Sequence, residues 1–185
     1  MRLFIAVKTP KEIRSKIAQI QEKFEELDID IKLVEPENLH FNLKFIGEYA
    51  EEKLPNLKKA LDNICSQFSA FDSHIAGIGS FPSPTYIRVI WLGMEEGSQA
   101  FSAIAEALDM GLEGLGIAKN DKKFTPHLTL GRVRSGKGRE ELISLLRDLK
   151  NTDIGTFRVD KIILFESKLG KKGPVYTEVH SVKLG

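Results

Sequence analysis

The sequence predicts an α+β fold with two lobes of antiparallel sheet and helices packed against them. Three features of the 185 residues support this prediction: strand and helix patterns alternate, several strands follow one another directly, and one strand-helix-strand theme is used twice. Consecutive strands without an intervening helix favour antiparallel sheets over a doubly wound parallel sheet. The sequence has no low-complexity segment or flexible linker, so we expect residues 1–185 to form a single bilobal domain.

The first half of the chain is expected to begin with a buried strand over residues 3–7, which are all apolar. A helix then opens with a cap, a proline in its first turn and an early acid. A short strand over 31–34 and a proline-containing turn lead into a strand over 40–46, which Gly47 ends. We expect a helix over 54–68 and a strand over 73–78. The apolar positions that define the first helix are Ile13, Ile17, Ile20, Phe24 and Leu27.

The second half repeats this alternation. A cluster of glycine, serine and proline over 79–84 is expected to break the chain before a strong strand over 86–92. A helix over 101–115 and a polar loop over 119–123 precede a strand that starts near residue 127. Helical spacing of leucines predicts a last helix over 142–149, and strands over 156–165 and 174–182 complete the chain.

The composition is that of a globular protein, with 42% hydrophobic and 29% charged residues. A net charge of +1 argues against a surface that binds nucleic acid everywhere, although a local basic patch is compatible with it. Cys65, the single cysteine, lies in a helical pattern and is expected to pack as a small hydrophobe. The first residues are too short an apolar run for a signal peptide, and no segment approaches the length of a membrane span. We therefore expect a cytoplasmic monomer without membrane contact.

Two short motifs resemble each other 87 positions apart, His40-Phe41-Asn42-Leu43 and His127-Leu128-Thr129-Leu130. Side chains alternate between the faces of a strand, so each motif would present its histidine and its polar residue on one face and its apolar residues on the other. Each lobe would then offer an imidazole and a hydrogen-bonding partner to a common cleft.

Such a pair suits acid–base chemistry on a phosphodiester. Histidine titrates near neutral pH, so one neutral and one protonated imidazole can act as base and acid in the same turnover. The Thr129 hydroxyl and the Asn42 amide are candidates for holding the non-bridging phosphate oxygens, and Arg132 and Arg134 are candidates for adding positive charge. Taken singly, a His-x-Thr on a strand is more often structural; two at equivalent points favour function.

The chain resembles the two-histidine phosphoesterase superfamily, in its RNA 2′,3′-cyclic phosphodiesterase branch, also called 2′-5′ RNA ligase. The resemblance runs nearly end to end. Its segments are Arg2-Leu3-Phe4-Ile5-Ala6-Val7, Asn38-Leu39-His40-Phe41-Asn42-Leu43-Lys44-Phe45-Ile46-Gly47-Glu48, Phe81-Pro82-Ser83-Pro84, Arg88-Val89-Ile90-Trp91-Leu92-Gly93, Thr125-Pro126-His127-Leu128-Thr129-Leu130-Gly131-Arg132, Phe165-Glu166-Ser167 and Gly173-Pro174-Val175-Tyr176.

The resemblance implies two lobes related by a pseudo-twofold axis, with catalytic His40 and His127 meeting across a groove. It implies opening of a 2′,3′-cyclic phosphate at an RNA end, transfer RNA fragments included, to leave a 2′-phosphate without metal or nucleotide cofactor. A related transfer to an RNA 5′-hydroxyl would make a 2′-5′ linkage. The family has threonine at both polar positions, so Asn42 is a departure for which we expect retained but altered activity.

Other residues are weaker candidates. Lys44, on the face of His40 by simple alternation, Arg88 and Tyr176 are candidate substrate contacts, each with a plain alternative as an exposed or core residue. Phe45 is expected in the core. His74 and His180, which no motif accompanies, are expected to be ordinary surface or core-edge residues.

Two other functions remain open. The chain could be an RNA-binding module of the same fold with weak or no catalysis, in which case it would tolerate loss of either histidine. A metal-dependent phosphoesterase is disfavoured, because no carboxylate or further histidine stands at a ligand spacing from His40 or His127. The sequence leaves open which histidine is the base.

Overall fold

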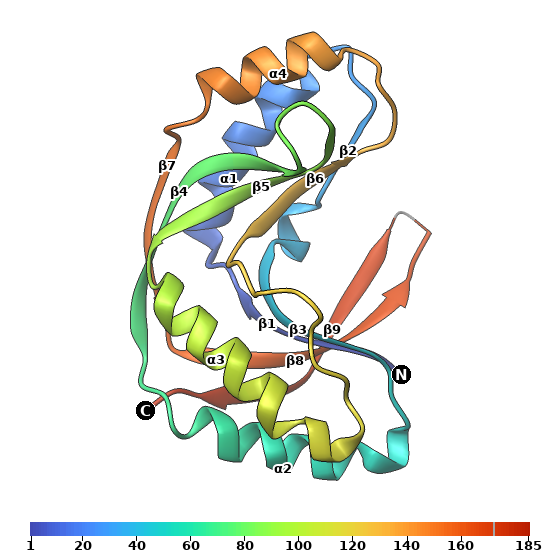
Figure 1. The fold of residues 1–185 in the computed structure, drawn as a ribbon, viewed down its shortest axis with the longest axis vertical. Helices are drawn as coiled ribbons and strands as arrows, with labels where there is room; N and C mark the ends of the chain where they lie inside the picture. The colour runs from blue at the N-terminus through green and yellow to red at the C-terminus, as the bar shows by residue number, and fades with distance from the viewer. Residues whose placement is uncertain (172) are drawn as a thin grey trace.

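The computed structural model describes residues 1–171 and 173–185 and shows a mixed helix and strand fold (Figure 1). Helices alternate along the chain with single strands or with groups of consecutive strands. The helices and strands are β1 (Arg2–Lys8), α1 (Lys11–Glu25), β2 (Ile31–Leu33), β3 (His40–Glu48), α2 (Leu54–Cys65), β4 (Phe71–Pro82), β5 (Ile87–Glu96), α3 (Ser98–Gly111), β6 (Leu128–Val133), α4 (Arg139–Asp148), β7 (Asp153–Val159), β8 (Lys161–Leu169) and β9 (Pro174–Lys183).

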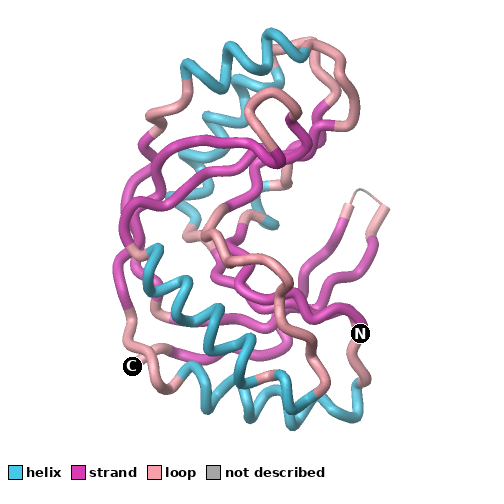
Figure 2. Tube along the Cα trace, in the orientation of Figure 1, coloured by secondary structure: helices cyan, strands magenta, loops and turns pink. Residues whose placement is uncertain are grey.

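The strands form one curled antiparallel sheet in the order β7-β4-β5-β6-β3-β1-β8-β9, with β2 also paired to β6. The sheet has two halves that meet where β3 pairs with β6, at Phe41 and Leu128. Helices α1 and α4 lie on the outer face at one end of the molecule, and α2 and α3 lie at the other (Figures 1 and 2). The predicted α+β fold with two lobes of antiparallel sheet is confirmed.

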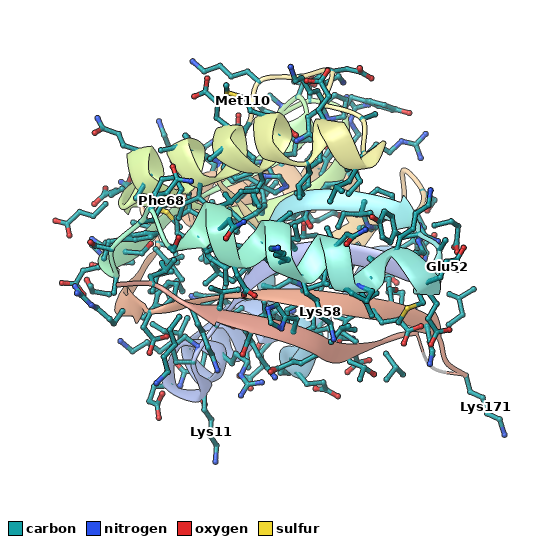
Figure 3. All side chains as sticks on the ribbon, turned by 90° about the horizontal axis from the view of Figure 1, so that it is seen from below. Lys11, Glu52, Lys58, Phe68, Met110 and Lys171 are labelled. Carbon is teal, nitrogen blue, oxygen red and sulfur yellow. The ribbon has the colours of Figure 1, made fainter. Side chains whose placement is uncertain are left out.

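Each lobe is covered by helices from both halves of the chain. Helix α1 follows β1 but packs beside β7, and α3 follows β5 but packs against β3. Seen from below, α2 and α3 lie side by side, and charged side chains such as Lys11 and Lys171 point away from the body (Figure 3). Among the described residues, no helix is long and apolar enough to cross a membrane.

Most buried side chains belong to one apolar core that spans both lobes, and a smaller, separate cluster surrounds Phe4. Phe24 of α1, Leu61 of α2 and Phe101 of α3 are fully buried and belong to the larger cluster. Cys65 is also fully buried in it, as predicted, and burial raises the pKa of its thiol to about 12. Such a thiol is protonated at neutral pH and unreactive.

Several predicted strand boundaries were wrong. Strand β3 runs through Gly47 to Glu48, and β5 continues to Glu96. Strand β4 does not stop at residue 78 but continues through the predicted breaker to Pro82, because Gly79 lies under the indole ring of Trp91 and gives it room in the sheet. Gly79 therefore serves as a packing position and not as a break.

The single strand predicted over 156–165 is two strands, β7 and β8, which Asp160 separates.

Candidate active site

A cleft of about 560 Å³ lies between the two lobes and contains both motif histidines. One wall comes from β1, β3 and the β8–β9 hairpin, and the other comes from β2 and β6. The lining side chains that carry the chemistry below are Arg2, Phe4, Lys32, Asn38, His40, Asn42, Phe45, His127, Thr129, Arg132 and Tyr176.

The two histidines are oriented by the same backbone interaction. Nδ1 of His40 donates a hydrogen bond to the carbonyl oxygen of Asn38 at 2.6 Å, and Nδ1 of His127 donates to the carbonyl oxygen of Thr125 at 2.7 Å. A carbonyl oxygen can only accept, so Nδ1 carries the proton in both rings. The other nitrogen, Nε2, is thereby left to exchange protons with a substrate.

Aromatic rings hold each imidazole in a matching way. The His40 ring lies 5.0 Å from the Phe4 ring and 5.4 Å, edge-on, from the Tyr176 ring, measured between centroids. The His127 ring lies edge-on 5.1 Å from Phe81, with Trp91 at 6.4 Å. These contacts fix the ring planes, which is what a proton-transfer geometry requires.

The histidines interact electrostatically across the cleft. Burial lowers the pKa of His40 below its usual value, the hydrogen bond to Asn38 opposes this shift, and the charge of His127 lowers the pKa further. Because a charge on one ring disfavours a charge on the other, the state in which both rings are protonated is disfavoured, which leaves at least one imidazole neutral. A neutral imidazole is what the general base of an acid–base pair requires.

The predicted phosphate-binding residues lie in the same cleft. Asn42 is exposed on β3, while Thr129 and Arg132 line the cleft from β6. Arg2 and Lys32 add positive charge, and Glu35 is the one carboxylate among the described lining residues. The cleft is therefore suited to an anion.

Tyr176, a candidate substrate contact, is also in the cleft. Burial raises the pKa of its hydroxyl, and the nearby charges of Arg132 and Arg2 act in the opposite direction. Its ring packs at 4.8 Å against Phe4 and edge-on against His40, so it contributes to holding the imidazole as well as lining the site.

The predictions for Lys44 and Phe45 were wrong, and one irregularity of β3 explains both. In the pairing with β1, Ile5 lies opposite Lys44, but the next residue, Ala6, lies opposite Asn42. Leu43 is therefore an extra residue in β3, a bulge that reverses which side chains of the following residues face the cleft. Lys44 is fully buried, where it forms an ion pair with Asp109 and donates to the carbonyl oxygen of Ala118. Phe45 is half exposed instead and lines the cleft.

Arg88 and Arg134 also lie elsewhere than predicted. Neither lines the cleft; both line a second, smaller pocket beyond the end of β6. Arg88 donates hydrogen bonds to the hydroxyl of Tyr86, two residues earlier in its own chain segment. Of the arginines that follow the second motif, the cleft contains Arg132 alone among the described residues.

Sequence reasoning missed several cleft residues. Arg2 and Phe4 could have been found from the alternation of β1, which puts them on the face of Ala6 and opposite Leu3 and Ile5. Lys32 faces the cleft because it pairs with Arg132 across β2 and β6, a register that nothing local in the sequence indicates. The Asn38 side chain donates to the carbonyl oxygen of Pro174 at 2.9 Å and so ties the first motif to the β8–β9 hairpin.

His74 and His180 lie outside the cleft and pair with carboxylates, His74 with Asp153 at 2.8 Å and His180 with Asp62 at 2.7 Å. Among the described residues, no group of three or more histidine, cysteine, aspartate or glutamate side chains is arranged to hold a metal ion.

Comparisons with known proteins agree with this geometry. The family model described as LigT-like phosphoesterase matches residues 7–91 and again 92–176, one match for each motif. An RNA 2′,3′-cyclic phosphodiesterase of Methanothermobacter thermautotrophicus is 37% identical over 100% of this chain and 99% of its own. A protein of the same description from Methanocaldococcus jannaschii is 38% identical over 95% of this chain and 96% of its own.

Solved structures show the same fold. A crystal structure of a protein from Thermus thermophilus has a TM-score of 0.85 at 32% identity and covers 100% of this chain and 98% of its own. The ligand-free crystal structure of LigT from E. coli has a TM-score of 0.75 at 25% identity, over 99% and 96% of the two chains.

Proposed function

Because the chain belongs to the LigT-like phosphoesterase family, we propose that it is an RNA 2′,3′-cyclic phosphodiesterase that opens the terminal cyclic phosphate to a 2′-phosphate. The observation that carries the proposal is the mirrored pair of imidazoles, each with Nδ1 bound to a backbone carbonyl, in one cationic cleft. The full-length relatives of that description, at 37% and 38% identity, support it.

In the proposed reaction one imidazole takes up a proton while the other releases one. One neutral imidazole takes a proton from water through Nε2 as the water oxygen attacks phosphorus. The bond between phosphorus and the 3′ oxygen breaks, and the other, protonated imidazole gives its proton to that oxygen. The product carries a 3′-hydroxyl and a 2′-phosphate, and the pair of histidines ends with the same number of protons.

The remaining cleft residues would stabilise charge on the phosphate. Asn42 and Thr129 can donate hydrogen bonds to the non-bridging oxygens, and Arg132 can offset the negative charge that develops there. Release of strain in the five-membered cyclic phosphate removes the need for a nucleotide cofactor. The same site could transfer the phosphate to an RNA 5′-hydroxyl, which would take the place of water and give a 2′-5′ linkage.

The direct test is hydrolysis of an RNA that ends in a 2′,3′-cyclic phosphate, with a chelator present and the product identified by its terminal phosphate. We expect a 2′-monophosphate. His40→Ala and His127→Ala should each lower kcat by at least about 100-fold while RNA affinity changes little, because each removes one proton-transfer group.

Other outcomes would contradict the proposal in distinct ways. Equal turnover by both alanine variants and the unchanged protein would contradict catalysis by this pair. RNA binding without any hydrolysis would favour the RNA-binding module, and activity that the chelator abolishes would favour a metal-dependent enzyme. We expect the natural substrates to be RNA fragments with cyclic phosphate ends, including fragments of transfer RNA. We expect the enzyme to act as a monomer in the cytoplasm.

A further inference from the structure

A second pocket of about 240 Å³ lies beyond the end of β6, outside the catalytic cleft. It is formed by the loop before β5, the loop between β6 and α4, and the first residues of α4. Its polar lining consists of Tyr86, Arg88, Arg134, Ser135, Lys137 and Arg139. The proposed reaction uses none of these residues.

The end of β6 connects this pocket to the cleft. Arg132 lines the cleft, and the next two residues line the second pocket. The pairing of β6 with β2 is regular here and extends to Arg134, whose amide donates to the carbonyl oxygen of Asp30 at 2.9 Å. Arg132 and Arg134 therefore project from the same face, about 7 Å apart along the strand.

The charge of the pocket is strongly positive. Of its four cations, Lys137 is paired with Asp28, and Arg139 donates to the carbonyl oxygen of Thr85. The Arg88 guanidinium donates to the hydroxyl of Tyr86, which leaves its charge unneutralised. The Arg134 side chain has no hydrogen bond or ion pair with any described residue. It is free to bind an anion.

An exposed aromatic ring accompanies these charges. Tyr86 is 54% exposed, and the Arg88 guanidinium lies 5.1 Å from the centre of its ring. A basic groove with an aromatic ring on which a base can stack is the arrangement that binds single-stranded nucleic acid without regard to sequence. An isolated phosphate would need the cations but not the ring.

We propose that this second pocket binds the RNA strand upstream of the cyclic phosphate, with Arg134 contacting a backbone phosphate and Tyr86 stacking on a base. The inference rests on the proposed function, which places the RNA end beside Arg132. From there the strand would follow the face of β6 past Arg134. The enzyme would then act better on an RNA end than on a mononucleotide.

The test compares two substrates, a mononucleoside 2′,3′-cyclic phosphate and a single-stranded RNA dodecamer with the same terminal nucleotide. Arg134→Gln should lower kcat/KM for the dodecamer about tenfold and leave the mononucleotide rate unchanged, because the mononucleotide does not reach the pocket. Tyr86→Ala should lower the dodecamer rate about fivefold by loss of stacking. Arg147→Gln, at the far end of α4, removes the same charge about 12 Å from Arg139 and should change neither rate.

Binding provides a readout that does not require turnover. For a dodecamer that ends in a 2′-phosphate, Arg134→Gln should weaken binding and reduce the slope of log affinity against log salt by about 0.7, the loss expected for one phosphate contact on a single strand. An unchanged slope, or equal losses with dodecamer and mononucleotide, would overturn the inference. If the unchanged protein hydrolyses neither substrate, the proposed function fails, and the salt dependence still decides whether the pocket binds RNA.

Discussion

At the scale of the residue, the lowered pKa of His40 has a consequence for the pH dependence of activity. The active form holds one added proton on the histidine pair, and acid adds a second. Burial and the charge of His127 both disfavour that second proton, so the acid midpoint of kcat/KM should lie below 6.5, the ordinary value for histidine. A pH–rate profile with the mononucleotide measures it. An acid midpoint above this ordinary value would contradict the coupling.

Asn42 gives a second prediction at this scale. An amide can donate to a phosphate oxygen, but it is planar and one atom longer than a threonine hydroxyl. Asn42→Ala should lower kcat about 100-fold, as expected for loss of one donor to a developing oxyanion. Asn42→Thr should have a kcat between that of the unchanged protein and that of Asn42→Ala. Identical kcat and KM in all three proteins would show that Asn42 does not contact the phosphate.

The placement of both histidines in the cleft could be predicted from the sequence, because it depends only on the alternation of side chains along each strand. His40, Asn42, His127 and Thr129 all lie in the cleft as expected. Lys44, only two residues further on, could not be placed, because the extra residue at Leu43 depends on the pairing with β1. Local sequence does not specify such a bulge.

At the scale of the element, the same bulge buries a charge and makes β3 dependent on α3. The Lys44 side chain is fully buried, and the Asp109 side chain from α3 is 20% exposed. Asp109→Asn leaves the ammonium group without its counter-charge and should lower the free energy of unfolding by about 3 kcal/mol. Urea denaturation measures this change.

A matched exposed pair provides the control. Glu113 and Lys119 form an ion pair at 2.9 Å, with both side chains more than half exposed. Glu113→Gln should change stability by less than about 0.5 kcal/mol. Equal effects of the two substitutions would show that the Lys44 pair contributes no more than a surface contact.

Element boundaries were predictable where periodicity was strong and not where packing decides. The helices were found from their apolar spacing. The extension of β4 through Gly79 depends on the Trp91 ring across the sheet, and the break at Asp160 separates two strands that lie toward opposite edges of the sheet. The partners of these strands are not close in sequence, so neither boundary has a local signal.

At the scale of the whole molecule, the lobes share an apolar core, so we expect them to unfold together. Trp91, the single tryptophan, lies on β5 next to β6, whereas Cys65, the single cysteine, lies on α2, which packs against β9 in the other half of the sheet. Tryptophan fluorescence and pulsed labelling of the thiol should give the same urea midpoint. Two separate midpoints would show that the lobes are independent domains.

The two motifs also have a bearing on how the site tolerates mutation. In many enzymes a carboxylate side chain holds the catalytic imidazole, and replacing that residue releases the ring. Here the acceptors are main-chain oxygens of Asn38 and Thr125. Every amino acid supplies such an oxygen, so a substitution at either position leaves the tautomer in place unless it moves the chain itself.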